Sequence, residues 1–141
     1  MIRQLSVFVQ NEIGSLASVT TVLKENEINL RAIASFDTPE FAILRMVVDQ
    51  PDKTKELLNK KGFAVKVSNA VAVELEDKPG VLDHMLHVIA EAGLGINYIY
   101  SIVLRNGKAP LMIVNTNDLS KTAEVLGREG FIIAEEEDLL S

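Results

Sequence analysis

The chain repeats itself once, and this repeat constrains its fold more than any other feature. A shift of 66 residues aligns the two halves without a gap for about thirty residues, so that Val7 falls on Val73 and Gly14 on Gly80. After two one-residue insertions, "KTKELLNKKGF" (53–63) aligns with "KTAEVLGREGF" (121–131). Self-similarity at a fixed period indicates repeated copies of one supersecondary unit. We therefore predict two domains, residues 1–68 and 70–141.

The first half of each copy predicts a strand and then a helix. Residues 5–9 and 71–75 alternate apolar residues with others, as half-buried strands do. Apolar and small residues then recur at i, i+3, i+4 and i+7 from Leu16 and from Leu82, which marks one face of a helix. The segments "INLRAIASF" (28–36) and "INYIYSIVL" (96–104) are rich in branched and aromatic residues and predict a second strand in each copy.

The second half of each copy continues with a strand, a helix and a short closing strand. "FAILRMVV" (41–48) and "APLMIVN" (109–115) follow turns at "DTPE" and "RNGK", the latter a hairpin signal. A helix then begins near Pro51 or Asp118 and ends at Gly62 or Gly130, where glycine suits a left-handed cap. The segments 63–67 and 131–134 predict the closing strands.

The order βαββαβ is that of the ferredoxin-like fold. We therefore expect an α+β protein made of two tandem domains, each with an antiparallel sheet and helices on one face. Only Ser68, Asn69 and Ala70 separate the two copies, which predicts that the domains pack side by side.

Composition excludes several classes of function. The absence of cysteine excludes disulfides, thiolate metal sites and a cysteine nucleophile. No apolar run approaches the roughly 20 residues that span a bilayer, and the N-terminus lacks the apolar core of a signal peptide, so we expect a cytoplasmic protein without membrane contact. Net charge is +1 over residues 1–69 and −7 over residues 70–141. Because no basic stripe is present, nucleic acid is not an expected ligand.

Three weaker signals do not predict a site. His84 and His87 lie three residues apart, but no third zinc ligand is identifiable, and we expect them on a solvated helix face. "KGFAVKV" (61–67) lacks the aromatic residues of an RNA-binding strand, and "GLG" (93–95) lacks the third glycine of a dinucleotide fingerprint. With no arrangement of nucleophile and base, we expect neither a catalytic site nor a metal or cofactor.

The junction "DKPG" (77–80) joins the first strand and first helix of the second copy, and "NEIG" (11–14) is its counterpart. Glycine allows close approach to the backbone, and proline presets φ for the first helical turn. The N–H groups of Gly80, Val81 and Leu82 would then have no helical partner and could bind a small carboxylate. Asp77 could hold an ammonium group. The alternative is an ordinary N-cap and turn without a ligand.

The repeated "NEIGSL…EINLRAI" and "DKPGVL…GLGINYI" in a βαββαβ frame resemble the ACT domain, a small module that regulates amino-acid metabolism. The resemblance covers nearly the whole chain as two domains in tandem. It implies that a free amino acid binds at the interface between two such domains. One domain supplies the loop after its first strand, and the other supplies the start of its second strand.

The match to the family's loop pattern differs between the copies. Asp77, Pro79 and Gly80 match it fully, whereas Ile13 replaces the proline of the first copy. Asn29 matches the polar position at the second strand, where the second copy has Gly95 and, two residues on, Asn97. The residues that the resemblance marks as ligand contacts are Asn11, Gly14, Ser15, Leu16, Asn29, Leu30, Asp77, Pro79, Gly80, Val81, Leu82 and Asn97. The best-matched site combines the loop of copy two with the Asn29 strand of copy one.

The leading hypothesis is a stand-alone, non-catalytic allosteric sensor of an amino acid, acting through an unidentified enzyme partner or through self-association. A small enzyme on the same frame and a structural interaction module without a ligand are the alternatives. The strand 41–48 is apolar on both faces, which predicts a homodimer. Ligand specificity is expected from side chains near the strand starts: Arg31, Ile33, Tyr98 and Tyr100.

Overall fold

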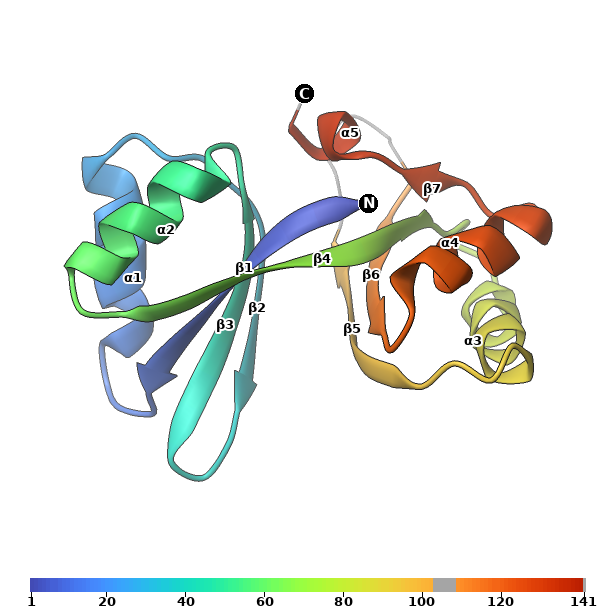
Figure 1. Cartoon of the computed structure of the whole chain (residues 1–141), viewed down its shortest axis with the longest axis horizontal. Coiled ribbons are helices and arrows are strands. Elements are labelled where there is room, and N and C mark those ends of the chain that lie inside the picture. The colour runs from blue at the N-terminus through green and yellow to red at the C-terminus, as the bar shows by residue number, and fades with distance from the viewer. Residues whose placement is uncertain (103–108, 141) are drawn as a thin grey trace. The chain divides into compact units, whose positions relative to one another are not determined.

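The computed structural model describes residues 1–102 and 109–140, which form two compact units (Figure 1). The first unit comprises Arg3–Ser68, and the second comprises Asn69–Leu139 together with Met1–Ile2. The hairpin expected at "RNGK" (105–108) lies outside the described residues. Among the described helices, none has the length and apolar character needed to cross a bilayer.

The first unit has the predicted βαββαβ order. Its elements are β1 (Ile2–Gln10), α1 (Ser15–Glu25), β2 (Leu30–Asp37), β3 (Phe41–Val48), α2 (Pro51–Lys60) and the first part of β4 (Ala64–Glu74). The strand order is β2-β3-β1-β4, and β1 and β2 both pair with β3 in antiparallel orientation. The helices α1 and α2 lie on the same face of this sheet (Figure 1).

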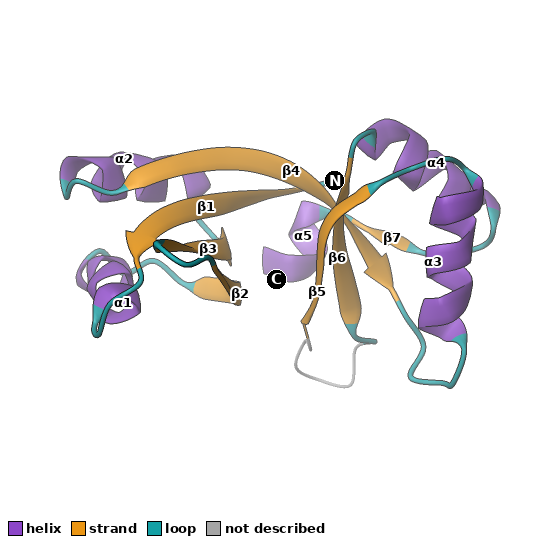
Figure 2. Cartoon of the chain, turned by 90° about the horizontal axis from the view of Figure 1, so that it is seen from below, coloured by secondary structure: helices purple, strands orange, loops and turns teal. Residues whose placement is uncertain are grey.

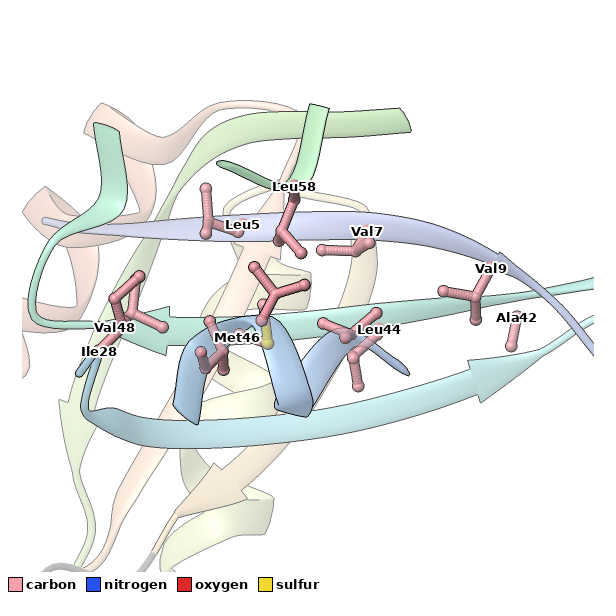
Figure 3. Close-up of a cluster of buried hydrophobic side chains, with 12 residues drawn as sticks. Leu5, Val7, Val9, Ile28, Ala42, Leu44, Met46, Val48 and Leu58 are labelled. Atoms are coloured by element: carbon pink, nitrogen blue, oxygen red, sulfur yellow. The ribbon is translucent and has the colours of Figure 1, made fainter. Parts of the chain in front are cut away.

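The core of the first unit lies between its sheet and its two helices (Figure 3). Leu5, Val7 and Val9 of β1 alternate toward the helices, as the period of two predicts. Leu44 and Met46 of β3 lie beside them in register, because Val7 pairs with Leu44 and Leu5 with Met46. From the helices, the core receives Val19, Val22, Leu23 and Leu58.

The second unit repeats this architecture. Its elements are the second part of β4, α3 (Val81–Glu91), β5 (Ile96–Ile102), β6 (Leu111–Thr116), α4 (Leu119–Arg128), β7 (Ile133–Ala134) and the short α5 (Glu136–Leu140). The strand order β5-β6-β4-β7 matches that of the first unit. The helices α3 and α4 flank one face of these strands (Figure 2), and Met85, Ile89 and Leu126 are buried there. The α+β fold of two ferredoxin-like domains is therefore confirmed.

The link between the copies differs from the prediction. Ser68, Asn69 and Ala70 do not form a separate linker, because β4 continues through them as one strand of 11 residues. Val65 and Val67 alternate with other residues before this segment, and Val71 and Val73 do so after it. The backbone stays extended throughout. The closing strand of copy one and the first strand of copy two are thus a single element.

Helix ends follow the predicted glycines. Gly62 and Gly130 both adopt positive φ, at 94° and 93°, just beyond α2 and α4. Part of the acidic segment "EEED" (135–138) forms the short helix α5. The Asp138 carboxylate accepts a hydrogen bond from the Glu135 N–H at 2.8 Å, and Leu139 is buried.

Candidate functional site

The loop 11–14 before α1 and the loop 77–80 before α3 have the same backbone pattern. Each consists of two bend residues and two turn residues, and the last of these is a glycine in the left-handed conformation. Gly14 has φ 86° and ψ −2°, and Gly80 has φ 89° and ψ −11°. Ile13 therefore takes the place of Pro79 without changing the path of the chain.

Pro79 does not have the role that the sequence predicted for it. The helix begins at Val81 with Gly80 as its N-cap, so the proline lies in the turn before the helix rather than in its first turn. The glycine is needed because φ near +90° disfavours any L side chain. A Cβ at Gly80 or Gly14 would meet no described atom within 4 Å, so the space in front of each glycine is open.

The helix starts leave backbone donors near these glycines. His84 N–H donates to Gly80 O at 2.9 Å, which closes the first helical turn of α3. Val81 N–H has no partner within the helix, as expected, but it donates to Lys78 O of the loop at 3.4 Å. The N–H groups of Leu82 and Asp83 precede the first possible intrahelical partner. In α1 the matching bonds run from Ser18 N–H to Gly14 O and from Ser15 N–H to Glu12 O.

A hollow of about 330 Å³ lies beside the first loop, within the first unit. Of the predicted site residues, it brings together Asn11, Gly14, Ser15 and Leu16. Its other wall comes from the far end of β2 and the start of β3. The lining residues that the sequence did not predict are Val9, Gln10, Glu12, Ala17, Ser35, Asp37 and Ala42.

A second hollow of about 230 Å³ occupies the equivalent place in the second unit. Of the predicted site residues, Asp77 and Leu82 line it, whereas Pro79, Gly80 and Val81 do not. The unpredicted lining residues are Leu75, Glu76, Lys78, Ser101, Pro110, Leu111 and Met112. Ser35 and Ser101 are matched positions of the repeat, and this identity was the available signal for the second wall.

The starts of the second strands are also held in the same way in both copies. Asn29 N–H donates to the Asp49 carboxylate at 3.1 Å, and Asp49 N–H donates back to Asn29 O at 3.2 Å. Gly95 and Asn117 exchange the corresponding two bonds at 3.1 and 3.2 Å. Gly95 is therefore the structural counterpart of Asn29 and carries no side chain to offer a ligand.

Both strands contain a β-bulge immediately after this point. In β2 the register shifts between Leu30 and Ala32, and in β5 it shifts between Ile96 and Tyr98. Arg31 and Asn97 are therefore the extra residues. Bulges redirect side chains and are frequent beside functional sites.

Asn97 is part of a local polar network. Its side-chain amide donates to Asn115 Oδ1 at 2.8 Å, and the Asn115 amide donates to the Asn69 carbonyl at 2.9 Å. The rings of Tyr98 and Tyr100 stack nearby, with centroids 6.4 Å apart. A ligand that used the Asn97 amide group would have to compete with this network.

The strand starts are remote from the hollow of their own unit. Asn29 precedes β2, whereas Ser35 and Asp37 line the first hollow from the opposite end of that strand. Six residues at about 3.3 Å each separate Asn29 from Ser35 by about 20 Å. Asn29 and Leu30 therefore do not belong to the first hollow.

The second loop carries an ion pair at its rim. Lys78 Nζ lies 2.7 Å from Glu76 Oε2. This hydrogen bond and the attraction of opposite charges lower the pKa of the Glu76 carboxyl and raise the pKa of the Lys78 ammonium. Both side chains are well exposed, so the pair is screened by water and salt.

The two histidines lie on an exposed helix face, as predicted. His87 Nε2 lies 3.4 Å from Asp83, and His84 Nε2 lies 4.0 Å from Glu129 and packs against the ring of Phe131. Across the described part of the chain, no three His, Cys, Asp or Glu side chains are grouped as metal ligands would be.

Comparisons with known proteins identify the family and the fold. A family model described as "ACT domain pair" matches residues 1–141. The solved structure of protein BT0572 from Bacteroides thetaiotaomicron is similar, with 32% identity and a TM-score of 0.88, over 98% of this chain and 94% of that chain. No match was found among curated protein sequences.

Regulatory subunits of aspartate kinase share the fold at lower identity. The ligand-free Thermus thermophilus subunit has a TM-score of 0.65 at 15% identity, and the alignment covers 91% of this chain and 92% of that chain. The Thermus flavus subunit has a TM-score of 0.62 at 14% identity, with the same coverage. Because the family model spans the whole chain and the fold and loops repeat as such a pair requires, this protein belongs to the ACT domain pair family.

Proposed function

We propose that this protein is a non-catalytic regulatory protein that binds a free amino acid at its loop hollows. The observation that carries the proposal is the duplicated loop: a left-handed glycine, an open helix start and an adjoining hollow recur in both copies. The first hollow, at about 330 Å³, reaches the lower end of the volumes typical of small-molecule sites.

The chemistry of the hollows suits a zwitterion. The N–H groups at the start of α1 and α3 and the positive end of each helix favour the ligand carboxylate. Asn11 and Asp77 line the two hollows and offer side-chain oxygens to the ligand ammonium group. The charged groups of the ligand thus lose bound water but gain protein groups of opposite polarity, which limits the free-energy cost of burying them.

Residues from a second ACT domain complete the site in this proposal. Asn29 and Leu30 lie at the strand end remote from their own hollow, so they can serve a loop of another domain. The favoured combination joins the loop of copy two with the Asn29 strand of copy one. Asn29→Ala and Gly80→Asp are then expected to weaken binding, and unchanged affinity in both variants would contradict the assignment.

We also propose self-association as a homodimer. Several large apolar side chains remain more than a third exposed in the single chain, among them Ile13, Leu16, Ile33, Phe8 and Phe41. Phe8 and Phe41 lie side by side, with ring centroids 6.2 Å apart, and contiguous exposed apolar side chains often mark interaction surfaces. Sedimentation equilibrium at micromolar concentration should give twice the mass of one chain. A mass of one chain would refute the dimer.

The test of the proposed function is thermal melting of the protein, after unfolding and refolding to remove any bound ligand, against each of the twenty amino acids. A ligand at 100 times its Kd adds about 2.7 kcal/mol to the free energy of unfolding. For a chain of this size the melting temperature then rises by several degrees. At least one amino acid should give this shift. Twenty unchanged curves would favour a structural interaction module, and chemical conversion of the bound amino acid would favour an enzyme.

A further inference from the structure

The two strand starts, Asn29 before β2 and Gly95 before β5, offer different groups to a ligand on the same backbone frame. Asn29 exchanges two hydrogen bonds with Asp49, one through its N–H and one through its carbonyl. Gly95 exchanges the same two bonds with Asn117. The backbone N–H is therefore used at both positions. A ligand that needs a donor at a strand start depends on the side chain, and glycine has none.

The Asn29 side chain can meet a ligand without breaking an existing bond. It is exposed, and within the described part of the chain no residue shares a hydrogen bond with its amide group. An amide has one oxygen acceptor and two N–H donors, so it can bond either to the carboxylate or to the ammonium group of an amino acid. Hydrogen bonds to charged groups are among the stronger ones.

Asn97 does not replace the missing side chain at Gly95. It is the extra residue of the bulge in β5, and its counterpart in β2 is Arg31. The Asn115 amide nitrogen donates to the Asn69 carbonyl, which can only accept. Asn115 therefore presents its oxygen to Asn97, whose amide nitrogen donates to it at 2.8 Å. To turn this nitrogen toward a ligand would break the bond and take the donor from the Asn115 oxygen.

We propose that the two binding sites that the repeat allows differ in affinity, and that the Asn29 amide makes the site that it serves the tighter one. The inference rests on the proposed function, in which each site takes one loop and one strand start. The site served by Gly95 lacks one hydrogen bond to a charged group of the ligand. Such a bond changes affinity by about tenfold or more. The chain therefore binds amino acids in two separate steps.

Equilibrium dialysis against an equimolar mixture of the twenty amino acids tests this inequality, on protein that has been unfolded and refolded to remove any bound ligand. Amino-acid analysis of both chambers counts the molecules bound per chain as the concentration of the mixture rises. The wild type should bind one molecule per chain first and a second only at concentrations about tenfold higher or more. A plateau at one molecule per chain would place the weaker site beyond reach and would support the inequality as well.

Gly95→Asn is the most informative variant, because it adds the missing amide to the second strand start. Gly95 does not have a positive φ, and a Cβ there would meet no described atom within 4 Å, so an asparagine fits this backbone. The two bonds with Asn117 use only backbone atoms of Gly95 and are kept. The variant should tighten the weaker step by about tenfold. Gly95→Ala is the matched control: it adds the Cβ without the amide and should change neither step.

Asn29→Gly is the converse variant. It keeps the two backbone bonds with Asp49 and should weaken the tighter step by about tenfold. Thermal melting of each variant shows that it is folded. Two molecules bound in a single step by the wild type, or a weaker step that folded Gly95→Asn does not tighten, would overturn the inequality alone. Binding of no amino acid by the wild type would overturn the proposed function as well.

Discussion

The left-handed glycine before α3 gives a quantitative test of the loop geometry. Gly80 has φ 89°, where an L side chain costs about 1–2 kcal/mol. Gly127 lies within α4 and does not have a positive φ. Alanine at this position should therefore stabilise the helix by about 0.5–1 kcal/mol. Both positions belong to the second unit, and a Cβ at either would meet no described atom within 4 Å. Neither substitution therefore introduces a clash with the described residues.

The two variants Gly80→Ala and Gly127→Ala remove the same backbone freedom from the unfolded chain, so that contribution cancels in their comparison. The free energy of unfolding of the second should exceed that of the first by about 1–2 kcal/mol, the cost of the left-handed conformation at position 80. Urea denaturation followed by circular dichroism measures both free energies, and both substitutions lie in the second compact unit of the chain. Gly80→Asn should fall between them, because asparagine adopts positive φ more readily than alanine. Equal stabilities for the two alanine variants would refute the loop conformation described above.

Three further outcomes follow from the contacts. Asp118→Ala should lower the free energy of unfolding by about 1 kcal/mol in urea denaturation, because the Asp118 carboxylate accepts a hydrogen bond from the Lys121 N–H at 3.0 Å. Gln50→Ala is the control and should change little, since the Gln50 side chain makes no cap bond to a described residue. Leu58→Ala should cost about 2–5 kcal/mol by calorimetry because this side chain is fully buried, and a cost below about 1 kcal/mol would contradict the core. In NMR titrations, Lys78→Gln should raise the pKa of Glu76 toward its ordinary value. The contribution of the Lys78 ion pair to stability should be lost as pH falls through the lowered pKa of Glu76, and also as pH rises through the raised pKa of Lys78; an unchanged Glu76 pKa in the variant would argue against the pair.

The sequence was sufficient for the fold because the repeat supplied every element twice. Gly62 and Gly130, for example, marked the same helix end in both copies. The link between the copies was not predictable from these patterns. Ser68 and Asn69 are residue types that are frequent in turns, whereas β4 runs through them as one extended strand.

The candidate site was predictable only in part, for a geometric reason. Sequence motifs identify residues that are close along the chain, such as Asn11 and Gly14 in one loop. The opposite wall of each hollow comes from the far end of the second strand, where Ser35 and Asp37 are more than twenty residues away from the loop. Which end of β2 faces the loop depends on the antiparallel order of the sheet, and the motif contains no information on it.

Backbone NMR in the presence of amino acids tests the central claim most directly. The spectrum of the ¹⁵N-labelled protein would be compared with and without a pH-matched mixture of the twenty amino acids. The proposed function predicts that shifts concentrate on the amides at the helix starts, Gly14–Ala17 and Gly80–Asp83, and on the hollow residues Ser35 and Ser101. An unchanged spectrum, or shifts confined to residues remote from both hollows, would contradict it.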